Sequence, residues 1–375
     1  MATAVTTDTL RSLAAFRAKN GCAISIYVDL DPSSTPTAPD VATKFNSILA
    51  ATEKRADGSP GGRDCRMALR DDLQRLRDWW DDEFDRDGTR GLALFASSAD
   101  GFFRALPLVE GVGDSIRIGP SLHLAPLAGA LDREGALVAV VSRERGHLYR
   151  FEDGGLREIA DESEEQPGQH DQGGWSQARY RRHIDHLVHQ HLKTVGAEVD
   201  RHARHGGLRI AVVGPDEMRR EFEGALSQEA RDAIIGWTTA EAHAGPQELL
   251  EAVRPLLDEA RARADRESLV RFEELRGRGE RSAAGWKQVL DAASDARVGT
   301  LLVEEGASSR AWECPQCGRA SADGGTCPLD GTKLEERDDA ADLALHQTLA
   351  HGGDVVRLGA GALGDARGIG ALLRY

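Results

Sequence analysis

The sequence has 375 residues, with 47 lysines and arginines against 62 aspartates and glutamates, and a formal net charge of −15. Its length predicts two or three domains, and its 40% share of hydrophobic residues is enough for ordinary cores. The negative charge excludes a general nucleic-acid binder, so contact with RNA would need a local basic surface. No stretch approaches the ~18 apolar residues of a membrane helix and no signal peptide is recognisable, so we expect a cytoplasmic protein without a membrane partner.

The sequence pattern of the first region, residues 1–130, predicts an α/β domain. It opens with a helix, and residues 22–30 then have the alternating and apolar pattern of a strand, followed by a loop. Residues 63–87 predict a long charged helix. Residues 90–97 and 101–108 predict a strand pair around a turn. We expect Cys22 and Cys65 to be ordinary buried or half-buried thiols.

The second region, residues 131–265, predicts an α/β domain with one long irregular loop. Strands are expected within residues 135–159, before a polar loop at 160–174 that has no periodicity and is a candidate functional loop. The helix that follows is expected to reach about residue 204, because its apolar residues recur at helical spacing. A buried strand at 208–214, a helix at 215–226, a further strand and a helix after Gly245 and Pro246 complete the domain.

The third region, residues 266–375, predicts a helix, a glycine-rich turn, a second helix and a strand. A cysteine-rich insert at 312–334 follows, and then a helix, a short strand and a glycine-rich end. Three of the five cysteines of the chain lie in this insert, which does not indicate a disulfide framework.

The insert carries two similar turns. Cys314 and Cys317 stand in Cys-Pro-Gln-Cys-Gly, and Cys327 and Asp330 stand in Cys-Pro-Leu-Asp-Gly. Two such turns that face each other can close a tetrahedron around one ion, so the sequence predicts a structural zinc site with these four ligands. A carboxylate is a harder ligand than a thiolate, so we expect Asp330 to lower the affinity for zinc. The alternative is a knuckle without metal, held as a loop by its prolines and glycines.

A Gly-Gly pair precedes a basic stretch at the start of the long helix. Gly173 and Gly174 allow close backbone approaches that a Cβ atom would prevent. Arg179, Arg181 and Arg182 lie within one helical turn and suit contacts with phosphates. The alternative is a flexible surface loop followed by an ordinary basic helix start.

Two stretches of the chain resemble motifs of archaeal and eukaryotic class I peptide-chain release factors. Residues 173–182, GGWSQARYRR, resemble their Gly-Gly-Gln-Ser-x-x-Arg-aromatic-x-Arg motif, and the C-terminal GIGALLRY resembles their Gly-Ile-Gly-x-Leu-Arg-Tyr end. The cysteine-rich insert lies where archaeal members carry a zinc-binding insertion. The chain is thus similar to the release factor and Pelota superfamily over its second and third regions. Residues 1–130 match poorly and lack the stop-codon motif Asn-Ile-Lys-Ser, so codon-specific termination is not expected.

The resemblance implies an α/β, three-domain release-factor-like architecture. A divergent N-terminal α/β domain would span residues 1–130, and a middle α/β domain with the Gly-Gly loop would span 131–265. A C-terminal α-β-α domain like a ribosomal protein would span 266–375, with the insert at 312–334. The glutamine of the family motif falls on Trp175, and Gln177 lies two positions later. This shifted form is similar to the loop of the eukaryotic peptidyl-tRNA hydrolases of ribosome quality control, of which the chain resembles a bacterial branch.

The resemblance also implies a reaction, the hydrolysis of the ester between a nascent peptide and tRNA on stalled ribosomes or large subunits. The implied catalytic residues are Gly173, Gly174, Ser176 and Gln177, with Gln177 ordering the attacking water. The implied RNA-binding residues are Trp175, Arg179, Arg181 and Arg182. The expected partners are the tRNA site of the large ribosomal subunit, peptidyl-tRNA and a translational GTPase.

Two alternatives are compatible with the sequence. The displaced glutamine favours a hibernation factor that occupies the ribosomal tRNA site without hydrolysis, whereas the intact Gly-Gly and arginine pattern favours catalysis. The helix also contains several histidines. Among them, His186 and His189 are one turn apart and could bind the same metal ion. No glutamate completes a His-Glu-x-x-His motif, so histidines that face solvent or RNA are the simpler interpretation.

Overall fold

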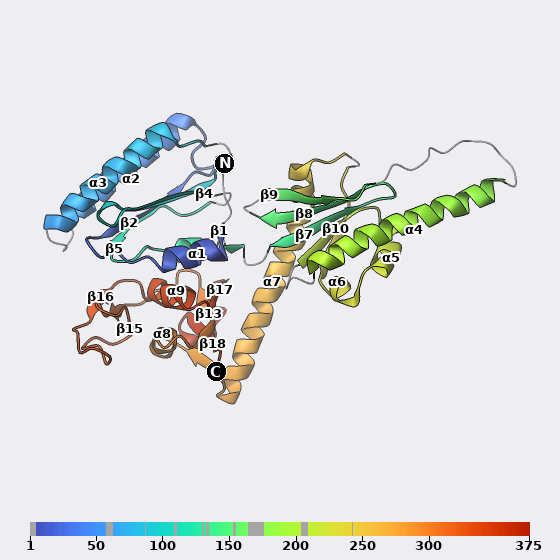
Figure 1. Cartoon of the computed structure of the whole chain (residues 1–375). Coiled ribbons are helices and arrows are strands. Elements are labelled where there is room, and N and C mark those ends of the chain that lie inside the picture. The colour runs from blue at the N-terminus through green and yellow to red at the C-terminus, as the bar shows by residue number, and fades with distance from the viewer. Residues whose placement is uncertain are drawn as a thin grey trace. The chain divides into compact units, whose positions relative to one another are not determined.

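The computed structural model describes residues 5–57, 63–86, 88–108, 111–129, 131–132, 135–152, 155–163, 176–203, 209–241 and 243–375. Contacts between residues divide the chain into two compact units. Unit 1 combines Met1–Asp132 with Asp265–Tyr375, and unit 2 is the continuous segment Arg133–Ala264. Both units contain β-sheets covered by helices, which confirms the α/β class (Figure 1).

An antiparallel sheet of order β4-β3-β2-β5 forms the N-terminal part of unit 1. Its strands are β2 (Ala23–Asp29), β3 (Gly91–Ser97), β4 (Phe102–Leu108) and β5 (Ser115–Gly119), with a 3-10 turn η1 (Ser98–Asp100) between β3 and β4. Two helices, α2 (Ala38–Asp57) and α3 (Arg63–Asp82), lie side by side on one face (Figure 1). The strand predictions are confirmed, and the predicted helix ends at Asp82 rather than residue 87.

The other face of this sheet shares one hydrophobic core with helices from the end of the chain. Tyr27 and Phe95 of the sheet belong to the same cluster as Leu290 and Leu343. The elements that bring these residues together are α1 (Thr7–Ala14), η2 (Ala125–Gly129), α8 (Trp286–Ser294) and α9 (Ala340–Ala350). Residues 1–132 and 265–375 therefore form one unit because they bury apolar surface against each other.

A second sheet of unit 1, of order β12-β18-β13-β17, lies under α8 and α9. Its strands are β12 (Ser282–Ala284), β13 (Val298–Glu304), β17 (Asp354–Leu358) and β18 (Ile369–Leu373), with a turn η3 (Gly364–Ala366) before β18. The C-terminal motif supplies β18, which pairs with both β12 and β13. Gly370 in β18 meets the ring of Phe272, and a Cβ atom there would lie 2.6 Å from Cζ of that ring. This close approach gives the glycine a packing role.

Two smaller sheets complete unit 1. β1 (Val5–Thr6) pairs with β6 (Leu131–Asp132), and the cysteine-rich insert contains β14 (Ala311–Glu313), β15 (Ala320–Ser321) and β16 (Glu335–Arg337). Cys22 is disulfide-bonded, so the expectation that it is an ordinary thiol is wrong. Cys314, Cys317 and Cys327 are free.

Unit 2 is a mixed sheet of order β11-β10-β7-β8-β9 between two layers of helices. Its strands are β7 (Ala136–Val141), β8 (Gly146–Glu152), β9 (Gly155–Asp161), β10 (Arg209–Val213) and β11 (Ile234–Thr238). One face is covered by α4 (Ser176–Ala203), α5 (Asp216–Ala225) and α6 (Gln228–Asp232), and the other by the first turns of α7 (Pro246–Arg278). The predicted order of elements in this region is confirmed, except that the short helix α6 was not predicted.

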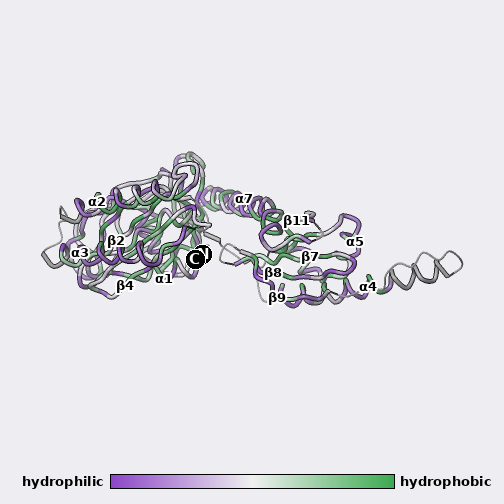
Figure 2. Tube along the Cα trace, turned by 90° about the horizontal axis from the view of Figure 1, so that it is seen from above, coloured by the Kyte–Doolittle hydropathy of each residue, from purple (hydrophilic) through white to green (hydrophobic). Residues whose placement is uncertain are grey.

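One helix in this region differs from the prediction. The sequence predicts separate helices before and after residue 266, whereas α7 runs without a break from Pro246 to Arg278. Residues 256–276 contain neither glycine nor proline, so nothing in the chain ends the helix there. Along α7, hydrophilic residues alternate with hydrophobic ones, while β7 is continuously hydrophobic (Figure 2). Within the described residues, no helix combines the length and apolar character that a membrane crossing requires.

Candidate functional site

The catalytic loop predicted from the sequence leads into α4. Gly173, Gly174 and Trp175 lie outside the described residues. Helix α4 starts at Ser176, so Gln177 lies in its first turn. Arg179, Arg181 and Arg182 lie in its first two turns, and the side chains of these five helical residues are also outside the description.

The rest of α4 is firmly packed on the sheet of unit 2. Val188, Leu192, Val195 and Val199 are buried at helical spacing in one core cluster, as the apolar pattern predicts. Close packing against α5 supports the same position, because a Cβ atom on Gly196 would lie 2.9 Å from the carbonyl oxygen of Ala225. The helix is therefore a rigid support whose N-terminal turns carry the motif.

The histidines of α4 do not form a metal site within the described residues. His186 and His189 are exposed, and Nδ1 of His189 lies 3.4 Å from a carboxylate oxygen of Glu221. His191 is fully buried, and its Nε2 lies 3.2 Å from the carbonyl oxygen of Arg145. The expectation of solvent-facing or RNA-facing histidines is thus wrong for His191, which packs beneath the β7–β8 turn.

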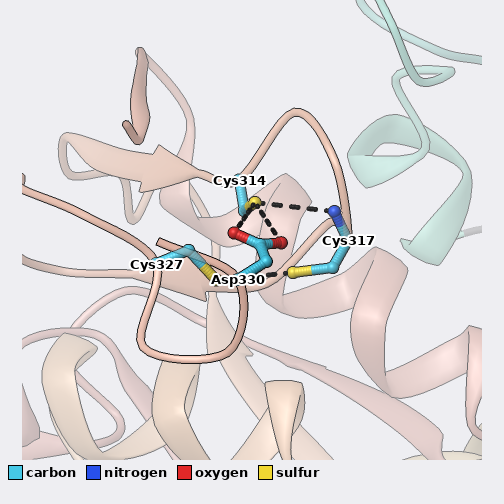
Figure 3. Close-up of side chains that lie close together, drawn as sticks. All are labelled: Cys314, Cys317, Cys327 and Asp330. Atoms are coloured by element: carbon cyan, nitrogen blue, oxygen red, sulfur yellow. Dashed lines mark hydrogen bonds between the residues drawn. The ribbon is translucent and has the colours of Figure 1, made fainter. Parts of the chain in front are cut away.

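The four predicted metal ligands come together in the insert (Figure 3). Their ligand atoms all lie within 4.8 Å of one another. Sγ of Cys314 is 3.4 Å from Oδ2 of Asp330, and Sγ of Cys317 is 3.5 Å from Sγ of Cys327. Zinc bonds of about 2.0–2.3 Å in a tetrahedron separate neighbouring ligand atoms by roughly 3.3–3.8 Å. The donor set and its spacing therefore fit zinc.

The two turns that carry these ligands have the same backbone pattern. The amide N–H of Gly318 donates to the carbonyl of Cys314, and that of Gly331 donates to the carbonyl of Cys327, each at 2.9 Å. Both glycines have a positive φ, 78° and 73°, which favours glycine. Asp330 thus occupies in the second turn the position that Cys317 occupies in the first.

Local hydrogen bonds favour the charged form of the carboxylate ligand. The backbone N–H of Thr332 donates to Oδ1 of Asp330 at 2.9 Å. This bond and the side-chain hydroxyl of Thr332 hold the pKa of Asp330 well below its usual range. A metal ligand must be deprotonated, so Asp330 is ready to bind a cation at neutral pH.

The insert is anchored to the rest of unit 1 by buried polar contacts. Glu313, which is 2% exposed, pairs with Arg17 from the N-terminal segment and with Arg337 at 3.0 Å. The side-chain amide of Gln347 in α9 donates to the carbonyl of Gly318 at 2.7 Å. The metal ligands are therefore held on a fixed base, as a structural site requires.

Two histidine–carboxylate clusters were not predicted from the sequence, because the residues of one are far apart in the chain and those of the other lie on different strands of a hairpin. On β8 and β9, Nδ1 of His147 lies 2.7 Å from Glu158 and 3.5 Å from Asp161, just before the loop that leads to α4. In unit 1, Nδ1 of His123 lies 3.2 Å from Oδ1 of Asp342 on α9. No local motif marks either pair, and only the spacing of strand residues could have suggested the first.

Comparison with known proteins finds a family model that is similar to the central part of the chain. Residues 123–257 match the model of bacterial archaeo-eukaryotic release factor family 10. The chain is also similar to peptide chain release factor subunit 1 of Methanosphaera stadtmanae, with 25% identity over 197 residues. That match covers 50% of this chain and 46% of the relative, so the chain spans about half the length of the curated relative it matches.

Solved structures show weaker similarity. The crystal structure of the archaeal translation termination factor aRF1 is 17% identical, with 99% of both chains covered and a TM-score of 0.28. Dom34 of S. cerevisiae, described as a translation termination-like factor that interacts with Hbs1, is 13% identical, with 73% of this chain and 74% of Dom34 covered and a TM-score of 0.37. TM-scores this low support no conclusion by themselves. The match of residues 123–257, which contain the Gly-Gly motif and α4, makes this segment of the chain similar to bacterial archaeo-eukaryotic release factor family 10.

Proposed function

We propose that this release-factor-like protein is a ribosome-associated peptidyl-tRNA hydrolase that frees nascent chains from stalled ribosomes or large subunits. The observation that carries the proposal is the position of the motif. Gly173 and Gly174 precede Trp175 and then a 28-residue helix that is anchored by its far half, and Gln177 lies in the first turn of that helix. The whole arrangement falls inside the segment that matches the family.

The charge at this end of α4 also supports a nucleic-acid partner. The N-terminus of a helix carries partial positive charge, so cations placed there reduce helix stability in isolation. Arg179, Arg181 and Arg182 nevertheless lie in the first two turns. Contacts with the phosphates of ribosomal RNA or tRNA would compensate for that cost. Trp175, which precedes the helix, would stack on a base.

In the proposed reaction, water attacks the carbonyl carbon of the ester that links the peptide to tRNA. The C–O bond to the tRNA breaks, the peptide leaves as a carboxylic acid, and the tRNA 3′ end regains its hydroxyl. The amide of Gln177 would hold the water against the carbon, and N–H groups of the loop and RNA hydroxyls would stabilise the oxyanion. Gly173 and Gly174 would let the loop enter a narrow site, with Ser176 fixing the start of the helix.

We propose that the chain has three functional domains, residues 1–130, 131–265 and 266–375. The compact unit 133–264 supports the boundaries on both sides of the middle domain. We propose the third segment as the ribosomal-protein-like part, with zinc held in a structural role by the insert. The proposed partners are the large-subunit tRNA site, peptidyl-tRNA and a translational GTPase, in the cytoplasm.

The decisive experiment measures release of labelled peptide from purified ribosome–nascent-chain complexes. We expect Gln177→Ala to abolish release while ribosome binding, followed by co-sedimentation, stays close to that of the parent. Gln190→Ala is the matched control, because Gln190 is an exposed glutamine farther along the same helix. Gly173→Ala should also reduce release, since its Cβ atom would restrict the loop. Release by Gln177→Ala at the parental rate would remove Gln177 from the mechanism.

One feature favours a second function. Trp175 occupies the register of the family glutamine, as expected of a factor that fills the tRNA site without hydrolysis. In that case the parent protein would bind ribosomes and release no peptide, and Gln177→Ala would change neither result.

A further inference from the structure

One imidazole and two carboxylates meet at the end of the β8–β9 hairpin in unit 2. Nδ1 of His147 lies 2.7 Å from Oε1 of Glu158 and 3.5 Å from Oδ1 of Asp161. One ligand atom from each of the three residues lies within 4.8 Å of the other two. Imidazole nitrogen and carboxylate oxygen are both ligands of zinc in proteins. The hairpin therefore offers three donors to one metal ion.

A β-bulge in β9 brings the two carboxylates to the same face of the hairpin. His147 lies opposite Asp161, and Tyr149 lies opposite Glu158, so β9 has one residue more than β8 between these two pairs. In a regular strand, residues three positions apart point to opposite faces. The bulge removes this conflict, because residues 159–160 both pack against the core beneath α4. Glu158 is thereby turned to the face of His147.

Ser163, just after β9, supports two of the three donors. Its Oγ lies 3.2 Å from Nε2 of His147, and its backbone N–H donates to Oδ1 of Asp161 at 3.0 Å. A metal on Nδ1 requires the ring proton on Nε2, where Oγ of Ser163 is placed to accept it. Hydrogen bonds from Ser163 also hold the pKa of Asp161 below its usual value. This carboxylate is therefore charged at neutral pH, as a metal ligand must be.

The distances in the cluster are close to those of a zinc site. Zinc bonds of about 2.0–2.2 Å in a tetrahedron separate a nitrogen from an oxygen ligand by roughly 3.3–3.5 Å. Asp161 already lies at such a distance from Nδ1 of His147. Glu158 is at hydrogen-bond distance, and its side chain is 47% exposed, so it can move outward by the roughly 0.7 Å that zinc needs. Three protein ligands leave one position for water.

We propose that His147, Glu158 and Asp161 bind a zinc ion through Nδ1 and one oxygen of each carboxylate. The site is separate from the cysteine-rich insert, which belongs to unit 1 and offers three sulfur atoms. One nitrogen and two oxygens favour zinc over magnesium, which prefers oxygen ligands only. The ion ties β8 to the end of β9, from which the chain continues toward the Gly-Gly motif.

Equilibrium dialysis of the full chain against saturating Zn²⁺, followed by elemental analysis, tests the proposal. We expect the parent to hold one zinc ion more than His147→Gln. The difference depends neither on zinc in the insert nor on peptide release, so it tests this site alone. His189→Gln is the matched control, because His189 is an exposed histidine of α4 that lies 3.4 Å from a single carboxylate, that of Glu221. It should keep the parental zinc count.

Two further variants keep the test decisive. Ser163→Ala retains all three ligands but removes the hydroxyl at Nε2, and should weaken zinc binding by about tenfold in isothermal titration calorimetry. Glu158→Gln changes a half-exposed ligand and should lose one zinc ion, even if His147→Gln does not fold. The proposal is overturned if the parent and the ligand variants hold equal amounts of zinc, if His189→Gln loses the same ion, or if Mg²⁺ displaces it at equal concentration.

Discussion

The sulfur atoms of Cys317 and Cys327 lie 3.5 Å apart, although the two residues come from different turns of the insert. With Cys314 and Asp330 they complete a set of four donors around one point (Figure 3). The exposure of the four residues alternates, since Cys314 and Cys327 are buried whereas Cys317 and Asp330 are exposed. The outer pair is therefore where ligand exchange and chemical attack are expected to begin.

Asp330→Cys should tighten the binding of zinc. The variant replaces a hard oxygen by a soft thiolate at a position with the same backbone geometry as Cys317, so we expect the dissociation constant to fall by at least about tenfold. Competition with a chromophoric chelator measures it. Asp323→Cys adds a thiol to the same insert at an exposed residue that pairs with Lys287, and should leave the affinity unchanged. Equal affinity of Asp330→Cys and the parent would argue against Asp330 as a ligand.

Mild treatment with hydrogen peroxide should join Cys317 to Cys327 and release zinc. The two thiolates lose two electrons to the peroxide, which takes up two protons and leaves as two water molecules. Only Cys314 and Asp330 then remain, which is too few ligands for a structural zinc site. Peptide mapping should find the Cys317–Cys327 disulfide, and a zinc indicator should report the released ion. Cys317→Ser should not form this bond, and full zinc retention after oxidation of the parent would contradict the prediction.

Asp342→Asn should destabilise the protein by about 1–3 kcal/mol at neutral pH, because a largely buried carboxylate that accepts several hydrogen bonds is replaced by an amide. Burial alone would raise the pKa of Asp342, but His123 and the N–H of Leu124 outweigh it and hold the pKa below its usual value. This carboxylate therefore stabilises the fold above about pH 4, and the contribution is lost as the pH falls through the lowered pKa. Urea unfolding should show the gap between parent and variant narrowing below about pH 4.

Gly370→Ala should destabilise unit 1 by about 1–3 kcal/mol, since the new Cβ atom would lie 2.6 Å from the ring of Phe272. Phe272→Leu removes the ring and should cost stability by itself, but the double variant should be more stable than the sum of the single changes predicts. Gly359→Ala is the control, because its Cβ atom would meet nothing within 4 Å. Additive effects at positions 370 and 272 would show that the two do not clash.

Local patterns in the sequence were sufficient for most individual elements. The metal ligands follow from two short repeats only a few residues apart, and the apolar spacing of Val188, Leu192 and Val195 identifies α4. Helix α2 was missed, although Val41, Phe45 and Leu49 recur at helical spacing and are buried. The sequence therefore does contain the pattern that predicts this helix.

Other features depend on contacts that no local pattern contains. Leu124 and Asp342 are 218 positions apart, so their hydrogen bond could not be anticipated from spacing. The same holds for the shared core of residues 1–132 and 265–375. The predicted catalytic loop falls on residues 173–175, outside the described part of the chain, so its site remains a prediction from sequence.

The division of unit 1 between the two ends of the chain has a consequence for synthesis. Segment 133–264 is continuous and can fold as soon as it has left the exit tunnel. Residues 1–132 emerge earlier, yet the core on the face of their sheet that carries Tyr27 and Phe95 is completed by α8 and α9, which are translated last. Strand β18 must also insert between β12 and β13 before the second sheet closes. The first part to be made should therefore be among the last to mature, with its apolar face exposed to chaperones in the interval.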